Sequence, residues 1–122
     1  MDNIKVFVYG TLKRGFYNNV YLKHSTFIGM ALTKYKYPMV GLEEEFPYLI
    51  NDKNHGKHVK GELFEIDDIT LKILDILEDY PHLYTRETIE LVIDGKEIEA
   101  ITYFATDEIK YQSLEFLEEF VK

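Results

Sequence analysis

The chain has 122 residues, of which 46% are hydrophobic and 15% aromatic, so it can fold as one domain with a packed core and is not a disordered segment. Its formal net charge of −8 repels polyanions, which argues against a nucleic-acid partner. The absence of cysteine excludes disulfides, thiolate catalysis and cysteine-ligated metals.

The sequence lacks the apolar core of a signal peptide, and no apolar run approaches the length that spans a bilayer. We therefore expect a single domain over residues 1–122, located in the cytoplasm and without a membrane partner. The sequence does not specify an oligomeric state.

The N-terminal part predicts a buried strand followed by a loop. Residues 4–9 are apolar on both faces, which predicts a strand covered on both sides. Gly10 and Gly15 bracket the next segment, and Asn18 or Asn19 is expected to cap a short helical turn.

The middle of the chain predicts extended segments and one helix. The extended segments are residues 26–37, 46–50 and 59–66, the last with Gly61 as a bulge. Asp67 or Asp68 is expected to cap a helix over residues 69–80, which Pro81 ends.

The C-terminal part predicts a hairpin and a second helix. Residues 86–93 and 98–104 flank Asp94-Gly95, a strong signal for a two-residue hairpin turn. The apolar spacing in residues 108–121 predicts an amphipathic helix. The pattern as a whole predicts the α+β class: a mixed, curled or barrel-like β-sheet with flanking helices.

The loop from Gly10 to Gly15 has half of the spacing of a nucleotide-phosphate loop. Phe16 and Tyr17 stand where the lysine and the hydroxyl residue are needed, which excludes nucleotide binding of that type. A loop relieved by glycines can instead present successive backbone N–H groups to a carboxylate or a carbonyl oxygen. The same spacing also fits a plain tight turn.

Glu78 is the carboxylate that the pattern singles out. It shares a helical row with Leu71 and Leu74, between an apolar arc and a charged face. The arc that we expect to be buried consists of Ile69, Ile73, Ile76, Leu77 and Tyr80, with Lys72, Asp75 and Asp79 opposite. The negative end of the helix dipole, the neighbouring acids and desolvation by Tyr80 and Tyr84 are expected to raise the pKa of Glu78. The alternative is an ordinary acidic helix end.

The other polar clusters carry no chemistry that we can assign. Residues 43–45 are a run of glutamates that is expected to form a solvated loop. His55 and His58 lack a third ligand at metal spacing, and Ser25 and Ser113 lie in no triad context. We therefore predict no metal and no cofactor.

Several segments together resemble the gamma-glutamylcyclotransferase-like family, and most closely its gamma-glutamylamine cyclotransferase branch. They are Tyr9-Gly10-Thr11-Leu12 with Lys13-Arg14-Gly15, the proline stretches 37–40 and 46–49, the segment 59–63 with Asp67, the block from Leu74 through Glu78, Pro81, Leu83-Tyr84 and Arg86, and finally Tyr103. The resemblance covers most of the chain apart from the expected terminal helix.

That resemblance implies a function. The backbone of Tyr9, Gly10, Thr11 and Leu12 would bind the gamma-glutamyl group of a small-molecule substrate, and Glu78 would be the general acid/base. The α-amino nitrogen of the substrate would attack its own γ-carbonyl, releasing 5-oxoproline and an amine without a metal or cofactor.

Tyr84, Arg86 and Tyr103 are the further candidates for substrate binding. Arg86 either neutralises a substrate carboxylate or pairs with Asp75 or Asp79, and Tyr103 either lines the pocket or packs in the core. Gamma-glutamyl dipeptides or another gamma-glutamyl metabolite are alternative substrates, and a binding module that lacks turnover is the alternative from another class.

Overall fold

The computed structural model describes residues 3–43, 46–105 and 116–121. Its elements in chain order are β1 (Ile4–Val8), the 3₁₀-helix η1 (Tyr17–Leu22), β2 (Thr26–Thr33), β3 (Met39–Glu43), β4 (Phe46–Leu49), β5 (Lys60–Ile66), α1 (Asp68–Leu77), β6 (Tyr84–Ile93) and β7 (Lys96–Ala105). Within the described residues, no helix has both the length and the hydropathy to cross a membrane.

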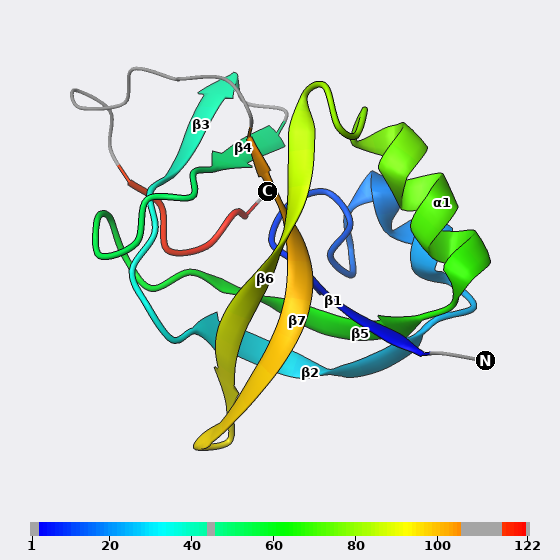
Figure 1. The fold of residues 1–122 in the computed structure, drawn as a ribbon, viewed down its shortest axis with the longest axis horizontal. Coiled ribbons are helices and arrows are strands. Elements are labelled where there is room, and N and C mark those ends of the chain that lie inside the picture. Colours follow the sequence, from blue (N-terminus) through cyan, green and yellow to red (C-terminus); the bar gives the residue numbers. More distant parts are fainter. Residues whose placement is uncertain (1–2, 44–45, 106–115, 122) are drawn as a thin grey trace.

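Five strands form a closed barrel in the order β1-β5-β2-β6-β7, and β3 and β4 form a separate two-stranded sheet (Figure 1). β1 pairs with β5 in antiparallel and with β7 in parallel orientation, so the sheet is mixed. α1 packs beside η1 on one side of the barrel. The predicted α+β class with a mixed, barrel-like sheet is confirmed.

The apolar side chains of β1 belong to two hydrophobic clusters, one on each face of the strand. Phe7 belongs to the cluster that includes Met39 and Leu49 of the small sheet. Val6 and Val8 belong to the cluster that includes Leu74 of α1. Because successive side chains of a strand point to opposite faces, this division confirms that β1 is buried on both sides.

The β6–β7 hairpin follows directly from its turn. Asp94 and Gly95 have φ values of 51° and 79°, the left-handed conformation that a tight hairpin turn requires. The ladder runs without interruption from Ile93↔Lys96 to Tyr84↔Ala105, so the hairpin is longer than predicted at both ends.

The face of α1 that is buried against the barrel differs from the predicted one. Asp67 caps it by accepting a hydrogen bond from Thr70 N at 2.8 Å, as expected, but the helix ends at Leu77 rather than at residue 80. Leu74 is fully buried, whereas Ile69 and Ile76 are 71% and 81% exposed. The predicted buried arc was therefore wrong for Ile69, Ile73 and Ile76, whereas Leu77 and Tyr80 are partly buried against the core. Apolar residues surround most of this helix, so periodicity alone does not distinguish the two faces.

Two further predictions need correction. β3 was not predicted, and it takes in Glu43 from the expected solvated loop, whereas residues 44–45 lie outside the described part of the chain. Of the expected terminal helix over 108–121, residues 108–115 also lie outside the described part, and residues 116–121 are not helical. Their backbone bonds go to strands instead, with Leu117 N donating to Met39 O and Lys60 N donating to Glu118 O.

Gly61 is required by packing and not by a bulge. The register shift lies in β2, between Phe27 and Gly29. A Cβ atom at Gly61 would lie 2.6 Å from ring atoms of Phe7 and from the carbonyl oxygen of Val8. β5 can therefore approach β1 this closely only without a side chain at this position.

Replacing Gly61 with alanine is expected to lower the free energy of unfolding by about 1–3 kcal/mol, because the added methyl overpacks the barrel. Gly29→Ala is the matched control, since its Cβ would meet nothing closer than Ile93 Cγ2 at 3.9 Å. That variant should match the wild type or gain roughly 0.4–1 kcal/mol. Urea denaturation measures both, and equal midpoints for the two variants would contradict the packing argument.

Candidate active site

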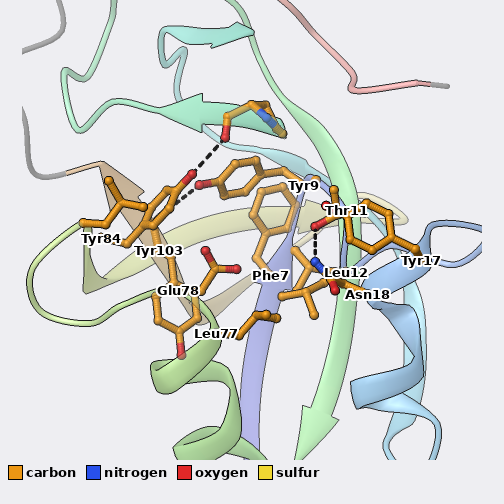
Figure 2. Close-up of a pocket in the computed structure, with 14 residues that line it drawn as sticks. Phe7, Tyr9, Thr11, Leu12, Tyr17, Asn18, Leu77, Glu78, Tyr84 and Tyr103 are labelled. Carbon is orange, nitrogen blue, oxygen red and sulfur yellow. Dashed lines mark hydrogen bonds between the residues drawn. The ribbon is translucent and has the colours of Figure 1, made fainter. Parts of the chain in front are cut away.

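A cavity of about 300 Å³ lies between the loop after β1 and the C-terminal end of α1 (Figure 2). It is lined by Phe7, Val8, Tyr9, Gly10, Thr11, Leu12, Tyr17, Asn18, Pro47, Leu77, Glu78, Leu83, Tyr84 and Tyr103. Among these described residues Glu78 is the sole carboxylate, and no lysine, arginine or histidine is present. The chemistry of this cavity therefore centres on one carboxyl group.

The loop over residues 9–12, which we call the substrate loop after the role that the resemblance implies for it, has backbone N–H groups without a partner among the described residues. The carbonyls of Gly10, Thr11 and Leu12 accept hydrogen bonds from Lys13 N at 3.1 Å, Asn18 N at 3.2 Å and Asn19 Nδ2 at 2.8 Å. Within the described part of the chain, the N–H groups of Gly10, Thr11 and Leu12 donate to no other protein atom. Three donors are thus left for a ligand.

Asn18 and Asn19 do not cap η1, contrary to the prediction. Phe16 occupies the N-cap position, without a side-chain hydrogen bond. Asn18 Nδ2 donates to Thr11 Oγ1 at 2.9 Å, and Asn19 Nδ2 donates to the Leu12 carbonyl. Both amides therefore fix the shape of the substrate loop instead of the start of a helix.

Glu78 is the C-cap residue of α1, one position beyond the last helical residue, whereas the prediction placed it within the last turn of a helix that continues to residue 80. The helix ends there because Asp79 adopts a left-handed φ of 51°, with Asp79 N donating to Ile76 O and Tyr80 N donating to Asp75 O. These two bonds form a Schellman motif, which turns the chain away from the helix axis. The Glu78 carboxyl points into the cavity, toward the side where Phe7 and Tyr9 lie (Figure 2).

Three tyrosines form neutral walls around this carboxyl. Tyr9 OH donates to the Tyr103 carbonyl, Tyr84 OH to the Pro47 carbonyl at 3.1 Å, and Tyr103 OH to Asp75 Oδ1 at 2.7 Å. Burial raises the pKa of all three phenols above the usual value of 10, so they stay protonated at neutral pH. Because each hydroxyl is used elsewhere, none of them solvates Glu78.

Burial raises the pKa of Glu78 from 4.5 to about 7. No hydrogen bond or ion pair to its carboxyl exists among the described residues, so nothing offsets the loss of water. The predicted rise is confirmed, but its cause is desolvation and not the neighbouring acids. Asp75 is paired with Arg86, and Asp79 is exposed.

Arg86 lies behind the cavity and not on its wall. Its Nε is 2.9 Å from Asp75 Oδ1, an ion pair without the alignment of a hydrogen bond, and its guanidinium lies 4.4 Å from the centre of the Tyr80 ring. Of the two roles considered for Arg86, the structure contains the ion pair with Asp75. Tyr80, which was expected to shield Glu78, faces this arginine instead.

The structure brings together Glu78, the substrate loop, Tyr84 and Tyr103, as expected, and adds residues that the sequence did not single out. The additions are Phe7, Val8, Tyr17, Asn18, Pro47, Leu77 and Leu83. Pro47 could have been found from the sequence, because it lies in one of the two proline stretches that carry the family resemblance. In the structure its ring packs on Gly10, where a Cβ atom would lie 2.9 Å from it. The glycine and the proline therefore pack directly against each other.

Comparison with known proteins identifies the family of the chain. Residues 6–119 match the family model described as gamma-glutamyl cyclotransferase, AIG2-like. The chain belongs to this family. Its fold matches the crystal structure of a mouse AIG2-like protein with a TM-score of 0.91 and 29% sequence identity, over 99% of this chain and 90% of that one.

Two relatives show similar coverage. A Methanocaldococcus jannaschii protein, whose name places it provisionally among gamma-glutamylcyclotransferases, is 46% identical over 81% of this chain and 82% of its own length. A zebrafish gamma-glutamylaminecyclotransferase is 42% identical over 82% of this chain and 68% of its own. The protein is accordingly a cyclotransferase-type enzyme.

Glu78→Gln is expected to stabilise the fold at pH 8. The wild-type carboxyl has a higher pKa folded (about 7) than unfolded (near 4.5), so the folded state binds the extra proton and the free energy of unfolding falls as pH rises between these values. The variant should exceed the wild type by roughly 1–3 kcal/mol at pH 8 and match it at pH 4.

Urea denaturation at the two pH values measures this difference. Glu87→Gln is the control, because it removes the same charge from an exposed position on β6. A Glu78→Gln variant that follows the control at both pH values would contradict the desolvation of this carboxyl.

Proposed function

We propose that this enzyme releases 5-oxoproline and a free amine from gamma-glutamyl amines such as gamma-glutamyl-lysine, with Glu78 as the general acid/base. The observation that carries the proposal is one carboxyl with a pKa of about 7 in a cavity that Gly10, Thr11 and Leu12 also line, whose three N–H groups have no partner among the described residues. A group that must take and return a proton works best when its pKa lies near the working pH.

The reaction is an intramolecular acyl transfer. Glu78 removes a proton from the α-amino group of the substrate, whose nitrogen then attacks the γ-carbonyl carbon and closes a five-membered ring. The carbonyl oxygen becomes an oxyanion, which the N–H groups of the substrate loop stabilise. When the bond to the leaving nitrogen breaks, Glu78 returns its proton to that nitrogen. The atoms balance without water or a co-reactant.

The shape and polarity of the cavity support this chemistry. Holding the two ends of one molecule together can lower the barrier by as much as about 7–11 kcal/mol in well-oriented cases. The buried phenols of Tyr9, Tyr84 and Tyr103 are neutral, so Glu78 is the one proton carrier that the described walls offer near pH 7. We assign Arg86 a positioning role, because it is paired with Asp75 one turn before Glu78.

The test is turnover of a small panel: gamma-glutamyl-lysine linked through the side-chain amine, a gamma-glutamyl alkylamine and a gamma-glutamyl dipeptide, with 5-oxoproline as the detected product. We expect the two amines to be converted faster than the dipeptide, and Glu78→Gln to lower kcat by about 10²–10⁴-fold. Product formation by Glu78→Gln at the wild-type rate would contradict the role of Glu78.

A second outcome separates catalysis from binding. If no member of the panel yields 5-oxoproline while 5-oxoproline still raises the melting temperature, the protein is a binding module and the enzymatic proposal fails. Preference for the dipeptide would keep the ring closure but reassign the leaving group.

The pH profile is a separate prediction. Because the carboxyl must be ionised to act as a base, log kcat/KM is expected to fall with unit slope as pH drops below about 7. Initial rates with gamma-glutamyl-lysine between pH 4.5 and 8.5 measure the profile. A profile that is flat down to pH 5 would show that no group with a raised pKa controls the reaction.

A further inference from the structure

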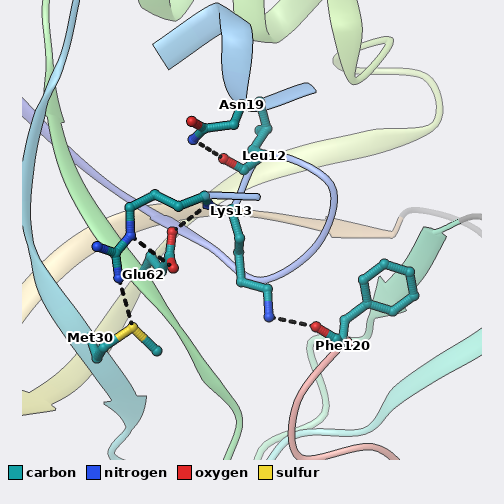
Figure 3. Close-up of polar contacts among 7 residues, drawn as sticks. Leu12, Lys13, Asn19, Met30, Glu62 and Phe120 are labelled. Atoms are coloured by element: carbon teal, nitrogen blue, oxygen red, sulfur yellow. Dashed lines mark hydrogen bonds and ion pairs between the residues drawn. The ribbon is translucent and has the colours of Figure 1, made fainter. Parts of the chain in front are cut away.

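Lys13 is a buried cation that the proposed chemistry does not use. It follows the substrate loop directly, and only 4% of its surface is exposed. Its Nζ donates a hydrogen bond to the carbonyl of Phe120 and lies 5.3 Å from the centre of the Phe16 ring (Figure 3). Burial removes part of the hydration of the ammonium and thereby lowers its pKa, although the nearby Glu119 and Glu62 act in the opposite direction. A lysine is rarely buried unless it is paired.

The partner of Lys13 belongs to the C-terminal segment, residues 116–121, which is itself tied to the body of the protein. Leu117 N donates to Met39 O at 2.8 Å, and Lys60 N donates to Glu118 O at 2.6 Å. The ring of Phe120 lies 5.5 Å from that of Phe16. This segment is therefore anchored on β3 and β5 and reaches the residues that follow the substrate loop.

Two other elements hold the same stretch of chain. Glu62 of β5, only 5% exposed, accepts hydrogen bonds from Arg14 N at 2.7 Å and Arg14 Nε at 3.3 Å. Asn19 of η1 holds the Leu12 carbonyl. Figure 3 shows these attachments converging on residues 12–14 from η1, β5 and the C-terminal segment. We name Lys13, Asn19, Glu62 and the Phe120 carbonyl the loop clamp.

The clamp holds the chain at and directly after the substrate-loop donors, whose direction matters for the proposed reaction. A hydrogen-bond donor stabilises an oxyanion only when it lies about 2.7–3.1 Å from the oxygen and points at it. A displacement of about 1 Å at a reacting group can cost 10²-fold in rate. Lys13 adjoins Leu12 in the chain, so releasing its side chain removes one of the attachments that hold the end of the donor array, and the bonds from Asn19 and to Glu62 remain.

We propose that Lys13 is a positioning residue that joins the C-terminal segment to the substrate loop, which makes residues 116–121 a functional part of the active site although none of them lines the cavity. This inference rests on the proposed function. The reacting groups are Glu78 and the loop N–H donors, and Lys13 acts through the latter.

Three variants test the proposal. Lys13→Met keeps the apolar stem and removes the donor. Lys13→Arg keeps a donor, and the cleft of about 400 Å³ that Lys13 lines between the loop and residues 119–121 has room for the guanidinium. Lys96→Met is the control, because it removes the same charge from the exposed end of the β6–β7 hairpin.

We expect Lys13→Met to lower kcat/KM for gamma-glutamyl-lysine by about 10–100-fold, mainly through kcat, because it misplaces the oxyanion donors. The apparent pKa near 7 in the pH profile of kcat/KM, which we assign to Glu78, should be unchanged in this variant. Lys13→Arg should recover most of the loss, and Lys96→Met should equal the wild type. Activity of Lys13→Met within twofold of the wild type would overturn the proposal.

Amide hydrogen exchange separates positioning from general stability. Lys13→Met should accelerate exchange at residues 10–12 and 117–118 and leave the β6–β7 ladder unchanged. Equal acceleration throughout the barrel would overturn the proposal. If Lys13→Met does not fold, Phe120→Ala removes the ring contact with Phe16 and keeps the carbonyl, and it should give the same local pattern with a smaller loss of kcat. The wild-type pattern and kcat in that variant would overturn the proposal.

The two proposals fail separately. If the wild type forms no 5-oxoproline, the proposed function fails, and binding of 5-oxoproline by calorimetry then tests the clamp. An affinity at least tenfold weaker in Lys13→Met would support the clamp, and an unchanged affinity would overturn it. If the wild type turns over and Lys13→Met equals it, only the clamp fails.

Discussion

The partial burial of the Glu78 carboxyl, without a hydrogen-bond partner among the described residues to replace the lost water, is the constraint on which the rest of the site depends. A carboxyl loses hydration in any cavity, but its pKa rises only if the protein offers no replacement. Here the candidates for replacement are committed elsewhere, since Tyr84 bonds the Pro47 carbonyl and Tyr103 bonds Asp75. The resulting pKa of about 7 is the value that the proposed roles of this glutamate as base and acid require under neutral conditions. Its ionised form costs stability, a conflict typical of functional groups.

The fold produces this environment by ending two elements at the same cavity. α1 stops in a Schellman motif at Asp79, which leaves Glu78 at the last turn with its side chain toward the barrel. β1 stops at Val8, and the following loop uses its own carbonyls for internal bonds, so its N–H groups are left for a ligand. The loop N–H groups and the Glu78 carboxyl therefore come from segments about 70 residues apart, held together by the hydrophobic cluster that Leu12, Leu74 and Tyr84 share.

Local signals predicted what local interactions decide. The Asp94-Gly95 turn, the Asp67 cap and the loop after β1 were predictable because their causes lie within a few residues of chain. The buried face of α1 was not, because isoleucines and leucines occupy both sides of the helix and only the barrel selects between them. Residues 116–121 look amphipathic, yet they are not helical, since β3 and β5 supply their backbone partners. The sequence did not decide whether Arg86 binds a substrate carboxylate or pairs with an acid of the helix, because only tertiary contacts distinguish the two roles.

A direct titration of the Glu78 side chain tests the central claim without reference to any substrate. With ¹³C-labelled glutamate, the carboxyl signal that disappears in Glu78→Gln identifies this residue, and its chemical shift can be followed from pH 3 to pH 9. The account predicts a midpoint near 7, well above the ordinary value of 4.5. A midpoint near 4.5 would show a hydrated carboxylate and would contradict the account.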